Sequence, residues 1–78
     1  MTIQEYAAKW AVVEFNSDTA GCPESHRNTN RQIFFEWAVR DEDSPIHAAL
    51  ASGEPEESVQ EQFDAGFNNM LAILTKMS

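Results

Sequence analysis

The sequence is short of basic side chains, cysteine and long apolar runs, and each shortage argues against a class of protein. Five Lys and Arg residues stand against 13 Asp and Glu, a formal net charge of -8 that repels the phosphate backbone of nucleic acids. The single cysteine, Cys22, has no internal partner, which excludes a disulfide-stapled secreted scaffold. No apolar run reaches membrane-spanning length and no signal-peptide pattern opens the chain, so we expect a cytoplasmic protein.

Glycine and proline are also scarce, at three residues each, and neither a linker nor an internal repeat divides the chain. We therefore expect residues 1–78 to form a single domain. Its core is expected to be modest, because a chain of this size buries only about 60% of its unfolded surface. Residues 16–30 are almost all turn formers and are predicted to be a long loop.

The N-terminal segment predicts a short helix. Thr2 and Glu5 stand in the arrangement of a capping box, and apolar residues follow at helical spacing, so a helix is predicted from about Thr2 to Lys9. Residues 10–15 are rich in side chains that favour strands, and we expect a strand there. A helix that continues to Phe15 fits the same residues and is the alternative.

The middle of the chain predicts two further strands. Residues 31–40 alternate with a period of two, which is typical of a strand. The alternating apolar set is Ile33, Phe35, Trp37 and Val39. An acidic turn would join this strand to a third one at 46–51. The alternative for 46–51 is a short helix, capped by Ser44–Pro45 and ended by Gly53.

The last segment, residues 55–77, predicts a long helix. Six apolar residues recur there at steps of three and four, and fall within ~80° of one another on a helix. They are Val59, Phe63, Phe67, Met70, Leu74 and Met77. The complete prediction is an α+β domain, α-β-β-β-α, in which a three-stranded antiparallel sheet packs against the long C-terminal helix. An all-α bundle is the alternative fold.

The negative charge is concentrated in one part of the chain. Residues 1–40 carry a net charge of -1, whereas residues 41–78 carry eight acids and one base, a net charge of -7. If the predicted last helix reaches back to residue 54, four acids at steps of three and four form a ridge ~15 Å long. These are Glu54, Glu57, Glu61 and Asp64, and the predicted hairpin turn adds Asp41, Glu42 and Asp43.

Such an acidic surface either keeps a small protein soluble or docks onto a basic surface of another protein. Residues near it could add specificity. Phe34 and Phe35 are adjacent and would face opposite sides of a strand. We expect the alternating set that contains Phe35 and Trp37 in the core, and Phe34 on the open face of the sheet near Glu36, as an aromatic anchor for a partner. The Cys22–Arg27 loop is a second candidate contact.

Neither a metal site nor a catalytic site is predicted. Cys22 and His26 have a spacing that metal sites use, but a structural zinc needs four ligands, and only His47 and scattered carboxylates remain. His47 is expected to point outward from the third strand, as a surface or lightly paired histidine. The chain contains no phosphate-binding, dinucleotide-binding or hydrolase motif. We therefore expect a protein that is not an enzyme and carries no cofactor.

Two resemblances bear on function. The predicted order of elements resembles that of the double-stranded-RNA-binding domain, but that family grips phosphates with lysines where Glu54–Glu57 stands here, so RNA binding is not implied. In size, compactness and clustered acidity, the chain is similar to small phage-encoded inhibitors of the anti-CRISPR and anti-restriction type, several of which imitate nucleic acid. That similarity implies a protein that acts in the cytoplasm of the host cell.

The sequence therefore leads to one main hypothesis and one alternative. The main hypothesis is an acidic interaction protein that binds a basic, nucleic-acid-handling protein or complex and blocks its nucleic-acid site. Its contact residues would be the acids at 41–43 and along the last helix, together with Phe34. The alternative is a small assembly module that forms a homodimer through its sheet, in which the acidity serves solubility only.

Overall fold

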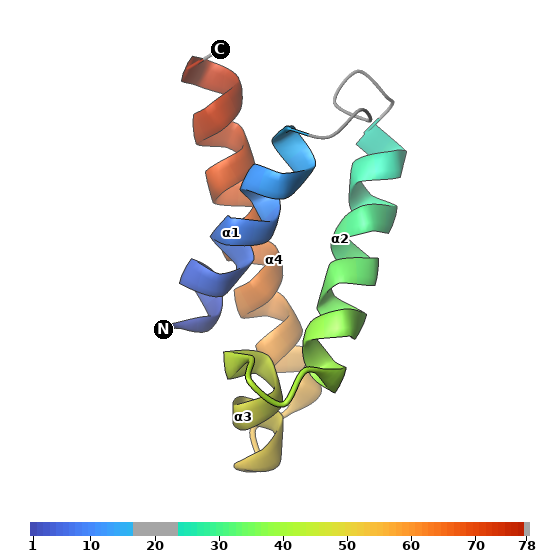
Figure 1. The fold of residues 1–78 in the computed structure, drawn as a ribbon, viewed down its shortest axis with the longest axis vertical. Coiled ribbons are helices and arrows are strands. Elements are labelled where there is room, and N and C mark those ends of the chain that lie inside the picture. Colours follow the sequence, from blue (N-terminus) through green and yellow to red (C-terminus); the bar gives the residue numbers. More distant parts are fainter. Residues whose placement is uncertain (17–23, 78) are drawn as a thin grey trace.

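The computed structural model describes residues 1–16 and 24–77, with residues 24–28 as backbone only. These residues form four helices and no strand: α1 (Ile3–Phe15), α2 (Glu24–Arg40), α3 (Pro45–Ala51) and α4 (Glu56–Met77) (Figure 1). The predicted α-β-β-β-α fold with its three-stranded sheet is therefore wrong, and the all-helical alternative describes the chain. The described residues therefore contain no sheet through which the expected homodimer could form.

The first helix begins where its cap was predicted. The Thr2 side chain accepts a hydrogen bond from the Glu5 backbone N–H, at 3.0 Å. The expected strand at 10–15 is instead the last part of α1, as the helical alternative had it. The reason lies in burial, because Ala7, Ala11 and Glu14 follow at steps of four and three and all lie inside the protein.

The expected strand at 31–40 and the second half of the expected loop at 16–30 are both part of α2. The two-residue alternation does not define a buried face, since Phe35 is 1% exposed whereas Trp37 is 54% exposed. The residues that enter the core are Phe35 and Ala38, three positions apart, and this step belongs to a helix. Burial on a helical period therefore overrides the β propensity of the aromatic and branched residues.

The expected strand at 46–51 is the short helix α3. Ser44 caps it by accepting a hydrogen bond from the His47 N–H at 3.1 Å, and Pro45 occupies the first turn, as the alternative prediction had it. The helix ends at Ala51. Gly53 follows with a φ of +98°, a left-handed conformation that suits glycine and turns the chain toward α4.

The last helix, α4, is confirmed almost as predicted. Val59, Phe63 and Phe67 are buried, whereas the far end of the stripe leaves the core, with Met77 79% exposed. The stripe packs against helices rather than a sheet. Ring centroids of Phe35 and Phe63 lie 5.5 Å apart, which joins α2 to α4 in the core.

The most extensive contact between helices joins α1 to α4, which run side by side (Figure 1). Gly66 of α4 is buried at this crossing, where a Cβ atom would lie 2.6 Å from the Gln4 carbonyl oxygen of α1. Ala7 and Ala11 of α1 are fully buried small residues on the same helix. The two backbones approach closely because these side chains are small or absent. The whole molecule measures 38 × 20 × 20 Å.

Candidate functional site

One end of the molecule gathers exposed carboxylates. The end is formed by α3 and by the two turns that join it to α2 and α4 (Figure 1). Six exposed acids lie in or beside these turns: Asp41, Glu42, Asp43, Glu54, Glu56 and Glu57. We call this set the acidic end. Within the described residues, none of the six forms an ion pair with a Lys or Arg side chain.

The first turn of the acidic end is held by hydrogen bonds on both sides. The Asp43 N–H donates to Asp41 Oδ1 at 3.0 Å, and the Ser44 N–H donates to the Asp41 carbonyl oxygen at 3.0 Å. Ser44 is buried, and its hydroxyl donates to the Ala38 carbonyl oxygen of α2. The carboxylates of this turn are therefore presented from a fixed backbone.

His47 makes a further contact between α3 and α2 beside this turn. Its Nδ1 atom lies 3.0 Å from the Val39 carbonyl oxygen, so the half-buried ring joins α3 to the end of α2. The predicted strand at this position is wrong, because residue 47 lies in α3, and the histidine is half-buried and paired through Nδ1. Its role is to hold the end of the molecule together.

The second turn places Glu54 beside the first. The Glu54 N–H donates to the Ala49 carbonyl oxygen of α3 at 3.1 Å. Glu42, Asp43 and Glu54 then line one open cleft of about 640 Å³, although Glu54 follows Asp43 by eleven positions in the sequence. Ile3 of α1 and Pro45 of α3 belong to its wall. Three carboxylates and an apolar wall suit a long cationic side chain, whose stem packs on the wall while its head meets the carboxylates.

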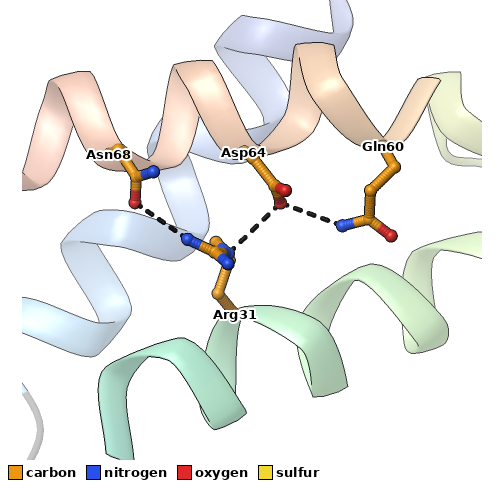
Figure 2. Close-up of polar contacts among 4 residues, drawn as sticks. All are labelled: Arg31, Gln60, Asp64 and Asn68. Carbon is orange, nitrogen blue, oxygen red and sulfur yellow. Dashed lines mark hydrogen bonds and ion pairs between the residues drawn. The ribbon is translucent and has the colours of Figure 1, made fainter. Parts of the chain in front are cut away.

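Only part of the predicted acidic ridge on α4 is exposed to solvent. Glu54, which precedes α4, is exposed together with Glu57 and Glu61 of the helix, whereas Asp64 is half-buried and occupied within the protein. Figure 2 shows that Asp64 faces Arg31 of α2, whose Nε atom lies 3.2 Å from Asp64 Oδ1. Asp64 is therefore a link between two helices rather than part of the exposed acidic surface.

Neighbours on α4 complete this link (Figure 2). Gln60 Nε2 donates to Asp64 Oδ1 at 2.9 Å, and an Arg31 guanidinium N–H donates to Asn68 Oδ1 at 3.3 Å. Sequence reasoning missed this link because residues 31–40 were expected to be a strand. On a helix, Arg31 falls on the same face as Phe35 and Ala38, four and seven positions further along.

Phe34 does not lie where the prediction placed it. It is half-buried and stacks on Trp10 of α1, with ring centroids 4.6 Å apart, and it also contacts Phe67 of α4. The exposed aromatic side chain on α2 is Trp37, which was expected in the core. Trp37 and Glu56 are thus exposed residues that the sequence prediction did not include among the contacts.

The Cys22–Arg27 segment can be compared with the structure only in part, because the backbone of residues 24–27 belongs to α2 and is not a loop. Cys22 lies outside the described residues, and so do the side chains of residues 24–28. Among the residues that are described, no three His, Cys, Asp or Glu side chains are grouped so that they could hold a metal ion. No helix in the described ranges has the length and apolar character needed to cross a lipid bilayer.

No protein-family model, no curated protein and no solved structure matches this chain.

Proposed function

We propose that this chain is a non-enzymatic interaction protein whose acidic end binds a basic, nucleic-acid-handling protein or complex in the cytoplasm and blocks its nucleic-acid site. One observation carries the proposal. Glu42, Asp43 and Glu54 come from two separate turns and line a single open cleft, and no Lys or Arg is among the described residues that line it. This mode of action is that of small phage-encoded inhibitors of the anti-CRISPR and anti-restriction type.

The gathering of like charges at one end of the molecule supports a role in binding. Carboxylates gathered at one end repel one another, and a surface selected for stability and solubility alone usually mixes both signs. Here the buried Ser44 ties the backbone of the turn to α2, which supports carboxylates that are presented from a fixed backbone. A preorganised negative surface speeds the encounter with a basic partner and disfavours acidic ones.

Competition with nucleic acid follows from the chemistry of the groups. Lys and Arg side chains that grip phosphates also form charge-assisted hydrogen bonds with carboxylates. A protein that fills such a groove with carboxylates removes the donors that nucleic acid needs. The exposed Glu57 and Glu61 of α4 extend the negative surface away from the cleft and lengthen the contact.

Capture from a bacterial lysate tests the proposal when it is joined to a competition step. The tagged chain is used as bait at low and high salt, and the proteins that elute are identified by mass spectrometry. We expect a nucleic-acid-binding protein that elutes as salt rises and is displaced from the bait by DNA or RNA. A captured protein that nucleic acid does not displace, or no captured protein at any salt, would contradict the proposal.

The matched control is a pair of double variants with the same change in net charge. Glu42→Lys with Glu54→Lys reverses two carboxylates of the cleft, and Glu5→Lys with Glu36→Lys reverses two exposed carboxylates elsewhere. Capture should be lost in the first variant and retained in the second. Equal loss in both would mean that total charge, rather than the acidic end, attracts the partner.

A further inference from the structure

Trp37 of α2, an exposed tryptophan, lies next to the first carboxylate of the acidic end. The Asp41 N–H donates to the Trp37 carbonyl oxygen at 3.0 Å, so a single helical turn leads from the tryptophan to Asp41. Residues four apart on such a turn are neighbours, with Cβ atoms about 5–6 Å apart. Trp37 is 54% exposed, and Asp41 is exposed as well. An indole ring and a carboxylate are therefore neighbours on the surface.

Two other aromatic rings hold the ring of Trp37 in place. Its centroid lies 6.0 Å from that of Trp10 and 5.8 Å from that of Phe34, and the ring planes are inclined by 61° and 57°. Trp10 and Phe34 stack on each other, with centroids 4.6 Å apart. A side chain that is already ordered loses little freedom when a partner binds, and tryptophan is a frequent anchor of interfaces.

The Asp41 carboxylate can still accept hydrogen bonds from a partner. Its Oδ1 atom accepts one from the Asp43 N–H, but a carboxylate has about four lone-pair sites. Within the residues that the structure describes, no Lys or Arg forms an ion pair with Asp41. Arg40, its neighbour in the chain, instead lines a separate hollow between α2 and α4, together with Glu36 and Glu56.

We infer, given the proposed function on which this rests, that Trp37 and Asp41 together bind an arginine side chain of the basic partner. The guanidinium plane stacks on the indole ring, and its N–H groups donate to the carboxylate. Charge complementarity selects a cation, because Asp41 belongs to the acidic end. The exposed ring beside it favours arginine over lysine.

The two cations differ in how they use an aromatic ring. The guanidinium group is planar and weakly hydrated, so it stacks on an aromatic face while its N–H groups still meet a carboxylate. The lysine ammonium group is a compact and strongly hydrated charge, for which carboxylates alone suffice. Trp37 therefore adds selectivity for arginine to the general attraction of the acidic end for bases. At an exposed site such stacking strengthens binding about two- to fivefold.

Two blocked peptides of equal charge, one of six arginines and one of six lysines, test this selectivity. Each is labelled and titrated with the full chain at low salt, and fluorescence anisotropy gives the dissociation constant. We expect the arginine peptide to bind about two- to fivefold more tightly. Equal affinity would overturn the inference and leave the proposed function standing, since both peptides would still bind the acidic end. Absence of binding by either peptide would count against both.

A change at Trp37 shows whether the preference for arginine comes from its ring. Trp37→Gln should weaken the arginine peptide to the level of the lysine peptide and leave the lysine peptide unchanged, whereas Trp37→Phe should retain part of the preference. Ile33→Gln is the control, since Ile33 is an exposed apolar residue of α2 one turn further from Asp41. It should leave the preference intact. A preference that persists in Trp37→Gln, or is lost equally in Ile33→Gln, would overturn the inference.

A change at Asp41 tests the carboxylate in the same way. Asp41→Asn removes the charge but keeps an Oδ1 atom that can accept the hydrogen bond from the Asp43 N–H, so the turn retains its support. Glu36→Gln removes the same charge from the other hollow and is the matched control. The arginine peptide should bind more weakly to Asp41→Asn than to Glu36→Gln. Equal effects of the two variants would overturn the role of Asp41.

Nuclear magnetic resonance of the unaltered chain gives a result that does not depend on how the variants fold. The chain has two tryptophans, Trp10 and Trp37, and therefore two indole N–H resonances. The resonance that is missing in Trp37→Gln belongs to Trp37. We expect the arginine peptide to shift this resonance at concentrations at which the lysine peptide leaves it in place. Equal shifts with the two peptides, or no shift with either, would overturn the inference.

Discussion

Arg31 of α2 and Asp64 of α4 form an ion pair, with the guanidinium Nε atom 3.2 Å from the carboxylate Oδ1 atom. The two side chains are 21% and 30% exposed, so solvent screens the pair only in part. The pair joins the second and fourth helices. It also separates Asp64 from its neighbours on the predicted ridge, because the other acids of that ridge face solvent.

The first prediction follows from this pair. Asp64→Asn should lower the free energy of unfolding by about 1 kcal/mol, because Arg31 loses a charged acceptor and Gln60 loses part of its hydrogen bond. Urea unfolding followed by circular dichroism measures the change. Glu61→Gln, on the exposed side of α4, is the control and should change stability by less than about 0.5 kcal/mol. Equal effects of the two variants would contradict a structural role for Asp64.

The second prediction concerns the crossing of α1 and α4. Gly66→Ala should destabilise the protein by about 1–3 kcal/mol, because the new methyl group meets backbone atoms of Gln4 that cannot move aside. Thermal unfolding should show a lower midpoint. The result is opposite to helix propensity, by which alanine is favoured over glycine by about 1 kcal/mol. Ala65→Gly at the exposed neighbour supplies the comparison, and a stabilised Gly66→Ala variant would show that the helices lie further apart.

The third prediction concerns the turn that presents the acidic end. Ser44→Ala removes the cap of α3 and leaves the buried Ala38 carbonyl oxygen without this donor, which should cost about 1–3 kcal/mol. Chemical denaturation measures this loss. Ser52→Ala at the exposed opposite end of α3 should cost less. If both serines proved equally dispensable, the turn at residues 41–44 would not be fixed by Ser44.

The fourth prediction concerns the exposed acids of α4. Glu57→Lys with Glu61→Lys should weaken binding to the captured partner by more than about tenfold at low salt, and by less as salt rises. Asp64→Asn should leave that affinity unchanged, since Asp64 is occupied by Arg31. Surface plasmon resonance at several salt concentrations gives both values. Unchanged affinity in the double variant would show that α4 does not contact the partner.

The sequence alone predicted the parts of the fold that depend on local signals. The Thr2 cap, the apolar stripe from Val59 to Phe67 and the concentration of acids at 41–64 all follow from neighbours in the chain. The predicted strand at 31–40 was wrong. Its aromatic and branched residues favour strands, but burial against α4 selects the helical period over the two-residue period of a strand. The sequence of residues 31–40 alone does not indicate that contact with α4.

For the candidate site, too, the sequence predicted local features and missed the contacts between distant segments. The acids of the cleft were identified by composition, but their assembly around one cleft depends on α3 bringing Asp43 and Glu54 together. Phe34 was predicted to be exposed and Trp37 to be in the core, and the structure shows Trp37 as the more exposed of the two. The error arose because the segment was predicted as a strand and is a helix. On a strand Trp37 shares a face with Phe35, whereas on a helix it points away from the core.

The affinity of the captured partner for two charge-matched variants tests the central claim most directly. The claim is that the acidic end, rather than total charge, binds a basic protein at its nucleic-acid site. The account predicts that Glu42→Lys with Glu54→Lys weakens binding at least about tenfold, while Glu5→Lys with Glu36→Lys leaves it nearly unchanged. Equal weakening by the two variants, or full affinity in both, would contradict the account.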